Sequence, residues 1–249
     1  MVQYTQFELA SAREVLEWAL AEFGSSLAIS TSFQKEGMVV LDMAAKISPD
    51  VRVFTIDTGR LPDETYQMIE TVRKHYGVKI EIVAPDAAEI ENMVAAHGPN
   101  LFYRDVSSRM LCCQIRKVRP LERKLATLRA WVVGLRRSQS ELRRAVPKVD
   151  GSNGSLVKIS PLADWSAEQV DRYIREHRVP LHPLYSAGYT SIGCEPCTRP
   201  VLEGEGERAG RWWWEQDAQK ECGIHFSPNG KVERRLDILV DEVLSAKHA

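Results

Sequence analysis

The sequence predicts an α/β fold built on a parallel sheet, and three observations support this prediction. Short apolar segments rich in β-branched residues alternate with amphipathic helical segments over residues 1–160. Glycine, proline and capping residues separate these segments at the spacing of strand–helix units. The chain has 249 residues, which is enough to bury a full hydrophobic core.

The predicted elements follow this alternation in chain order. Gly24 and Gly77 stop two of the helices, and Pro62 opens one of them. Ser166 and Gln169 form a capping box. Parallel strands need helical crossovers, so we expect helices on both faces of the sheet. We expect helices over residues 5–23, 38–46, 62–76, 87–96, 113–128, 166–176 and 231–246, and strands over residues 27–30, 51–57, 78–83, 131–135 and 157–160.

The character of the chain changes after residue 177. Closely spaced prolines and glycines between residues 180 and 200 exclude long helices there, and residues 201–210 are rich in glycine and glutamate. We therefore expect one α/β domain over residues 1–200. We expect a mobile tail over residues 201–249, which carries Cys222 and the last helix and folds over that domain.

The overall composition excludes several classes of protein. The net charge is −1 and 44% of the residues are hydrophobic, so nothing in the composition favours nucleic acid or a membrane as partner. No apolar run approaches the ~20 residues of a spanning helix. Residues 1–15 lack a signal-peptide core, so we expect a cytoplasmic protein whose thiols stay reduced.

Four of the five cysteines form two pairs. Cys112 and Cys113 are adjacent, and Cys194 and Cys197 form a C-x-x-C pair. Four soft ligands from two distant segments suit an iron–sulfur cluster or zinc. Neighbouring helical residues point ~100° apart, so the adjacent pair reaches two irons of one cube more easily than one zinc ion. Zinc remains the alternative, because C-x-x-C is also a common zinc half-site.

Cys222 is the fifth cysteine and stands alone near His225. A nearby cation lowers the pKa of a thiol and raises its thiolate fraction, so this cysteine is a candidate nucleophile. An inert, partly exposed thiol is the competing interpretation.

Polar segments follow three of the predicted strands. In an open α/β sheet, ligands bind outside the carboxyl ends of the strands, where hydroxyl groups, helix N-termini and arginines can hold an anion. Ordinary loops and surface charge are the competing interpretation. The candidate residues are Ser30, Thr31 and Ser32 after the first strand, Asp57, Thr58 and Gly59 after the second, and Arg136 and Arg137 after the strand over residues 131–135.

Further basic side chains lie close to the cysteines in the sequence. Lys117 is about one helical turn after the adjacent cysteine pair. Arg208 and Arg211 precede three consecutive tryptophans, a combination that suits either an anionic ligand or packing of the tail. Nucleic-acid binding by this patch is disfavoured because the patch is short and the chain is neutral overall.

Together these segments resemble the assimilatory adenylyl-sulfate reductases, the iron–sulfur branch of the adenylyl-sulfate/phosphoadenylyl-sulfate reductase family. The resemblance covers nearly the whole chain. It implies a fold like that of the PP-loop ATP pyrophosphatases and a [4Fe-4S] cluster on Cys112, Cys113, Cys194 and Cys197. The motifs that carry it are VFTIDTGRLPDETY, CCQIRKVRPL, GLRRSQS, GCEPCTRPV, GRWWWE and KECGIH, in the family's order.

The resemblance also implies a reaction. Cys222 matches the family's catalytic cysteine, which attacks the sulfur of adenylyl sulfate, releases AMP and becomes an S-sulfocysteine. A thioredoxin-type dithiol then releases sulfite, as a step of sulfate assimilation and cysteine biosynthesis. Lys117, Arg208, Arg211 and His225 fall where the family places phosphosulfate contacts, and the three strand-end segments fall at nucleotide-binding positions.

Several alternatives stay open. Gln34-Lys35-Glu36-Gly37 departs from the family's Gly-Ala-Glu-Asp-like stretch, and Lys35 adds a positive charge there, so a phosphoadenylyl-sulfate or dual-substrate reductase is an alternative. A PP-loop ATP-dependent sulfur transferase such as a tRNA thiolase is another, although its Ser-Gly-Gly-x-Asp-Ser type of loop is lacking. A zinc-stapled nucleic-acid binder is a third. The oligomeric state is open, a homo-oligomer included.

Overall fold

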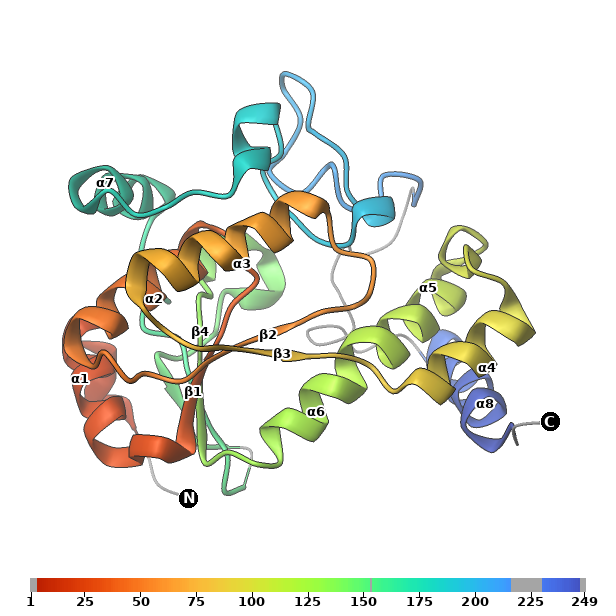
Figure 1. Ribbon diagram of the computed structural model, residues 1–249, viewed down its shortest axis with the longest axis horizontal. Coiled ribbons are helices and arrows are strands. Elements are labelled where there is room, and N and C mark those ends of the chain that lie inside the picture. Colours follow the sequence, from red (N-terminus) through yellow and green to blue (C-terminus); the bar gives the residue numbers. More distant parts are fainter. Residues whose placement is uncertain (1–3, 153, 216–229, 247–249) are drawn as a thin grey trace. The chain divides into compact units, whose positions relative to one another are not determined.

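The computed structural model describes residues 4–152, 154–215 and 230–246 (Figure 1). The chain divides into two compact units. Unit 1 consists of Met1–Thr55, Pro62–Ile82 and Lys124–Ala187, and unit 2 consists of Ile56–Leu61, Val83–Arg123 and Gly188–Ala249. The tail predicted over residues 201–249 belongs to unit 2. The division into a domain over residues 1–200 and this tail stays a prediction.

Helices and strands alternate through the first part of the chain, as the sequence predicts. The α-helices are α1 (Ala12–Phe23), α2 (Lys35–Ile47), α3 (Asp63–Tyr76), α4 (Ala87–His97), α5 (Val106–Cys113), α6 (Arg119–Leu125), α7 (Ala167–His177) and α8 (Gly230–Ser245). The strands are β1 (Leu27–Ser30), β2 (Val53–Ile56), β3 (Ile80–Val83), β4 (Ala130–Val133), β5 (Val149–Asp150) and β6 (Val157–Ile159).

The strands form one sheet of order β3-β2-β1-β4-β6-β5. β1 is parallel to β2 and to β4, and β4 is parallel to β6, which confirms the predicted α/β class with a mostly parallel sheet. The short edge strand β5 runs antiparallel to β6 and was not predicted, because two residues carry too little pattern to identify a strand.

The predicted extent of the first helix is wrong. Residues 5–23 form a 3₁₀-helix over Thr5–Glu8 and a separate helix α1. Ser11 is extended and accepts a hydrogen bond from the Glu14 amide, while the Glu14 carboxylate accepts one from the Ser11 amide. This capping box starts α1 at Ala12. The box predicted at Ser166 is present and starts α7.

The helix predicted over residues 113–128 is also wrong in its extent. Asp105 caps α5, which therefore begins seven residues before the predicted start and contains both adjacent cysteines. A π-helical turn over Gln114–Val118 leads from α5 into α6. The helical residues run without a break from 106 to 125, so Pro120 lies inside this run, directly after the π-helical turn, and the irregularity expected at a proline within a helix coincides with that turn.

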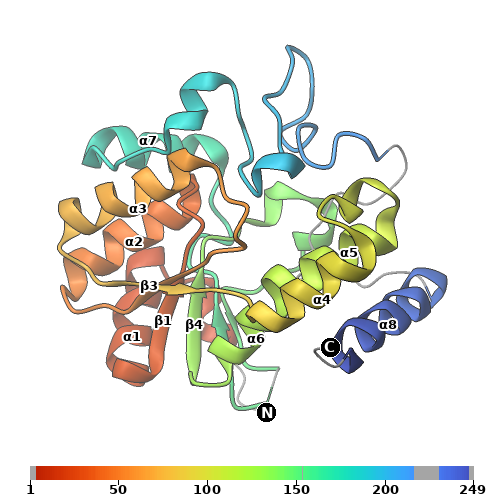
Figure 2. The same ribbon diagram turned by 45° about the vertical axis from the view of Figure 1, so that its right-hand side comes forward.

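Each unit has its own hydrophobic core. In unit 1, α2 packs against α1, α7, β1 and β4 (Figure 1). Residues such as Leu16, Ile29 and Val132 are fully buried in this core. In unit 2, α8 lies beside α4 and α5 in both views (Figures 1 and 2). Met93, Leu111 and Trp212 are buried in this second core. Among the described residues, no helix has both the length and the hydrophobicity required to span a bilayer.

Candidate functional site

Two regions contain almost all the predicted site residues that the structure describes. The first, called the strand-end region, belongs to unit 1 and comprises residues 30–37 after β1 and residues 134–137 after β4. These strands are adjacent and parallel, and Ser30 pairs with Val133 at their carboxyl ends. The strand order reverses here, since β1 leads to β2 on one side and β4 leads to β6 on the other. This is the place where open α/β sheets bind ligands.

Two glycines let the halves of the strand-end region approach closely. A Cβ on Gly134 would lie 2.5 Å from the Gly37 backbone nitrogen, and one on Gly37 would lie 2.6 Å from the Thr31 hydroxyl oxygen. The Thr31 hydroxyl accepts a hydrogen bond from the amide of Phe33, which is buried and has φ of 58°. The loop conformation is therefore set by packing and hydrogen bonding, and Ser32 stays exposed at its surface.

The two predicted arginines have different environments. Arg136 is buried, and it donates hydrogen bonds to Glu36 on α2 at 2.8 Å and to the Ser138 hydroxyl at 2.7 Å. Arg137 turns the other way, donating to the Val146 carbonyl and pairing with Glu8 in the first 3₁₀-helix. Arg136 thus belongs to the wall of the strand-end region, while Arg137 attaches the N-terminal segment.

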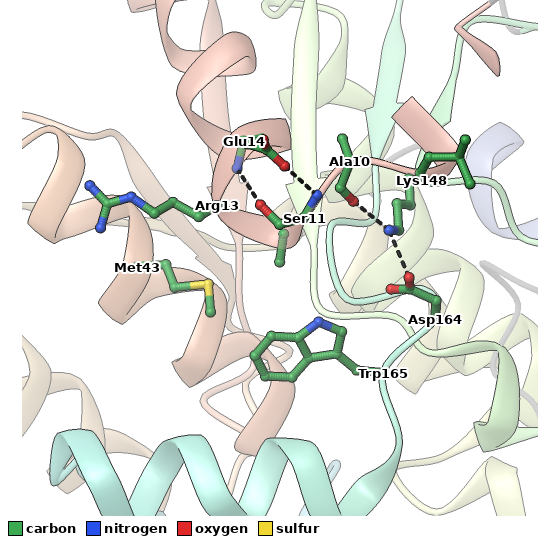
Figure 3. Close-up of a pocket in the computed structure, with 10 residues that line it drawn as sticks. Ala10, Ser11, Arg13, Glu14, Met43, Lys148, Asp164 and Trp165 are labelled. Atoms are coloured by element: carbon green, nitrogen blue, oxygen red, sulfur yellow. Dashed lines mark hydrogen bonds and ion pairs between the residues drawn. The ribbon is translucent and has the colours of Figure 1, made fainter. Parts of the chain in front are cut away.

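A cavity of about 390 Å³ lies in unit 1 beside this N-terminal segment (Figure 3). Its buried Lys148 donates to the Ala10 carbonyl at 2.6 Å and pairs with Asp164 at 2.7 Å. Ser11 and Glu14, which also line it, satisfy each other in the capping box. These polar groups already have protein partners, and their contacts hold the N-terminal segment in place. We therefore assign no group that lines this cavity to the candidate site.

The second region, called the cysteine region, belongs to unit 2 and comprises Cys112, Cys113, Cys194 and Cys197 with the residues that contact them. Cys112 and Cys113 end α5, whereas Cys194 precedes and Cys197 ends a 3₁₀-turn over Glu195–Cys197. Cys112 and Cys197 are buried in the second core, and Cys194 packs against it. The structure therefore brings together the two cysteine pairs that the sequence places about 80 residues apart.

Burial and mutual repulsion disfavour free thiolates in this region. Burial raises the pKa of Cys112 to about 12, with Cys113 and Cys194 adding to the effect and Arg116 and Arg60 opposing it. Burial likewise raises the pKa of Cys197, where Arg211 opposes the shift. Without a bound cation Cys112 and Cys197 would stay protonated at neutral pH, and a bound metal centre would deprotonate them.

Thr58 lies in the cysteine region, although the sequence suggested a nucleotide-binding role for it. Its hydroxyl oxygen is 3.2 Å from the Cys194 sulfur, and its carbonyl accepts a hydrogen bond from Arg116 at 2.9 Å. Asp57 accepts the Gly59 amide at 2.8 Å and so forms the turn that places Thr58. The sequence could not reveal the link to Cys194, because the two residues are 136 positions apart.

The tryptophan segment closes the cysteine region on another side. The Trp212 amide donates to the Cys197 carbonyl at 3.1 Å, and the Arg211 guanidinium stacks on the Trp212 ring and packs against Gly193. Arg208 lies within 3.5 Å of the Ser191 hydroxyl. The packing interpretation of this motif is confirmed for Trp212, which lies in the second core, whereas the role of Arg208 and Arg211 toward an anionic ligand stays a prediction.

Lys117 is half-buried within the π-helical turn that follows the adjacent cysteine pair. Such turns are frequent at functional sites, because they change which side chains share a helix face. The remaining two predicted residues, Cys222 and His225, lie outside the described residues.

The donor set of the cysteine region fits an iron–sulfur cluster. Four thiols are the ligand type that such clusters take, and arginines lie close enough to shift the pKa of two of them. The Trp212 indole N–H is buried without a hydrogen-bond partner among the described residues, so it is a donor available to a cluster sulfur. Over the same residues, no three His, Cys, Asp or Glu side chains form a ready metal-ion site.

Comparison with protein families and curated proteins gives consistent matches. The family described as phosphoadenosine phosphosulfate reductase domain matches residues 26–200. The adenosine 5′-phosphosulfate reductase of Allochromatium vinosum is 48% identical over 88% of this chain and 87% of that protein. The enzyme of the same name from Pseudomonas aeruginosa (strain LESB58) is 47% identical over 86% of this chain and 82% of that protein.

Solved structures agree on the fold. The phosphoadenylyl-sulfate reductase from Candida auris, in a phosphate complex, has a TM-score of 0.66 at 30% identity and covers 79% of this chain and 97% of that chain. The FMN adenylyltransferase of Candida glabrata has a TM-score of 0.54 at 12% identity over 94% of this chain and 80% of that chain, which shows the fold alone. The predicted PP-loop type of α/β fold is confirmed.

Proposed function

Because the chain belongs to the phosphoadenosine phosphosulfate reductase family, we propose that it is an oxidoreductase that reduces adenylyl sulfate to sulfite and AMP in sulfate assimilation. The observation that carries this proposal is the meeting of both cysteine pairs in one region of unit 2. The resemblance assigns such pairs to the branch that uses the nucleotide without a 3′-phosphate. The curated relatives that match most of their own length bear the corresponding name.

We propose that Cys112, Cys113, Cys194 and Cys197 hold a [4Fe-4S] cluster. When bound, such a cluster would supply positive iron charge and would deprotonate its four thiol ligands. Arg116 and Arg211 are buried beside these thiols and offset the negative charge of thiolate ligands. The Thr58 hydroxyl adds a hydrogen bond at Cys194.

Substrate recognition is proposed to use the strand-end region for the nucleotide. Ser30, Thr31 and Ser32, with the N-terminus of α2, offer hydroxyl and N–H groups to a phosphate. The sulfate half then needs cations, because AMP leaves readily only when its growing negative charge is neutralised. Lys117, Arg208, Arg211 and His225 are the proposed sources of this charge.

The proposed chemistry is a two-step transfer with balanced electrons. The Cys222 thiolate attacks the sulfur of adenylyl sulfate, a sulfur–sulfur bond forms, and the sulfur–oxygen bond to AMP breaks with its electron pair leaving on AMP. One thiolate of a thioredoxin-type dithiol then attacks the Cys222 sulfur, and sulfite leaves with the bonding pair. The second donor thiol resolves the mixed disulfide, so the dithiol is oxidised by two electrons and the transferred sulfur is reduced by two.

Reduction of the 3′-phosphorylated nucleotide is the second candidate, and Lys35 is the observation that favours it. Its positive charge at the start of α2 is paired with Asp171 of α7 at 2.8 Å and lies over the Tyr185 ring. The pairing lowers the charge available to a 3′-phosphate, so the unphosphorylated nucleotide is preferred as substrate.

Turnover with both nucleotides, measured as sulfite release with thioredoxin supplied, tests the proposal. We expect adenylyl sulfate to be the better substrate by kcat/KM. A protein that turns over only the 3′-phosphorylated nucleotide would establish the second candidate. Release of pyrophosphate from ATP would instead indicate the PP-loop sulfur transferase.

A further inference from the structure

A buried arginine connects the cysteine region to the segment that precedes Cys222. Arg109 lies on α5, four residues before Cys113, so the two side chains share one helix face. Its side chain is completely buried, and its Nε is 2.5 Å from a carboxylate oxygen of Glu215. The guanidinium thus interacts with both the Glu215 carboxylate and, one helical turn further on, the Cys113 side chain.

Glu215 is the last described residue before the segment that carries Cys222, seven positions further on. Its side chain is 6% exposed, and its amide donates to the Trp212 carbonyl at 2.9 Å. One of its carboxylate oxygens has no hydrogen-bond partner among the described residues. A buried carboxylate needs a compensating charge, so its position depends strongly on Arg109.

The tryptophan between them completes the connection. The centroid of the Trp212 ring lies 4.5 Å from the Arg109 guanidinium carbon, and the Trp212 amide donates a hydrogen bond to the Cys197 carbonyl. Trp212 and Glu215, which lead into the segment of Cys222, therefore contact one cysteine of each pair. Trp212 is bonded to the backbone of Cys197, and Glu215 is linked to Cys113 through Arg109.

We propose that Arg109 is a positioning residue that couples cluster binding at Cys113 to anchoring of Glu215, so that each stabilises the other. This inference rests on the proposed function, because it requires thiolates that hold a cluster. With Cys113 as a ligand thiolate, Arg109 lies between two anions that both hold it in place. Coupling between two events is reciprocal, so loosening Glu215 should also weaken retention of the cluster.

The test compares Glu215→Gln with wild type in the iron-loaded protein. The variant keeps the shape of the side chain and removes the charge that Arg109 binds. We expect it to release iron to a chelator about tenfold faster, and we expect the peptide bonds of residues 216–229 to be cleaved faster by a protease. The matched control is Glu89→Gln, which removes the carboxylate of the Arg119–Glu89 pair in the same unit. It should change neither rate.

Two further measurements keep the inference falsifiable. Arg109→Lys retains the charge but not the planar guanidinium, so it should release iron at an intermediate rate. In the wild-type protein, removal of iron should speed amide hydrogen exchange over residues 212–222 and leave α3 unchanged. Two results would overturn the coupling. One is iron release from Glu215→Gln at the wild-type rate, and the other is an amide hydrogen exchange rate over residues 212–222 that is the same with and without iron. Wild-type protein that contains no iron and sulfide would refute the proposed cluster itself.

Discussion

The strand-end region and the cysteine region satisfy their buried polar groups in different ways. In the strand-end region, Arg136 is hydrogen-bonded to Glu36 and Ser138, and Thr31 to Phe33. In the cysteine region, the buried N–H groups that lack a hydrogen-bond partner among the described residues include the Trp212 indole, Arg116 Nε and Arg211 Nε. Buried polar groups are nearly always paired in native proteins. The buried side chains of the strand-end region named here are paired within the protein, whereas the cysteine region has buried donors available to a further group.

Serine replacement of a proposed ligand cysteine and of Cys222 separates the two roles of sulfur, and these two variants should have the largest effects. Cys197→Ser removes a buried proposed ligand, so we expect loss of iron and acid-labile sulfide, and a fall in turnover of at least ~10²-fold. Cys222→Ser is the matched variant. It should lower turnover by at least ~10³-fold while retaining full iron content. Metal analysis of both proteins checks this contrast, and loss of iron from Cys222→Ser would contradict it.

Gly134→Ala should damage the strand-end region alone. The added methyl group would collide with the backbone of Gly37 and Glu36, so we expect a loss of about 1–3 kcal/mol in the free energy of unfolding. We also expect AMP to bind about tenfold more weakly while iron content is unchanged. Gly206→Ala is the control, because nothing lies within 4 Å of its added Cβ. Equal behaviour of the two variants in urea unfolding would argue against the packing described.

His182 should make the stability of unit 1 dependent on pH. Burial lowers its pKa from the ordinary value of 6.5, and the negative charge of Glu64 opposes this shift. The His182 ring lies 3.0 Å from the Thr65 hydroxyl and accepts a hydrogen bond from the Leu184 amide. In the pH range between the folded and unfolded pKa values, His182 binds a proton in the unfolded chain but not in the folded one. The contribution of His182 to the free energy of unfolding is therefore fully present above pH 6.5 and falls as the pH drops below it, by up to ~1.4 kcal/mol per pH unit.

Urea unfolding between pH 5 and 8 measures this effect. His182→Asn keeps an acceptor for the Leu184 amide but cannot titrate, so its stability should vary less with pH than that of wild type. A slope in the variant equal to that of wild type would assign the effect to other groups.

Asp171→Asn should have the smallest effect and sharpens the substrate preference. Removing this carboxylate frees the Lys35 charge, and a half-exposed ion pair contributes at most ~1 kcal/mol. We expect kcat/KM for the 3′-phosphorylated nucleotide to rise up to about fivefold, with little change for adenylyl sulfate. Kinetics with both nucleotides check this, and an equal change for both would show that Lys35 does not discriminate between them.

The sequence predicted the strand positions and helix ends that depend on local sequence patterns. Alternating apolar segments located β1, β2, β3, β4 and β6, and glycine or capping residues located the ends of α3 and the start of α7. It missed the start of α5, because Asp105 is the cap and no hydrophobic period precedes the cysteines clearly.

Long-range pairing was beyond the sequence alone. The ion pair of Arg109 with Glu215 joins residues 106 positions apart, and the turn at Asp57 gave no sign that Thr58 meets Cys194. Arg137 looked equivalent to Arg136 in the sequence, yet it pairs with Glu8 in the N-terminal segment. Such contacts depend on how the chain packs, and no local spacing encodes them.

Mass spectrometry of the Cys222 peptide tests the central claim most directly. Anaerobic protein incubated with adenylyl sulfate and no dithiol should accumulate an adduct of about 80 Da on that peptide, as expected for a sulfonate on sulfur. Subsequent addition of thioredoxin should remove it and release an equal amount of sulfite. Sulfite release without any adduct on Cys222, or an adduct on one of the paired cysteines instead, would contradict the account.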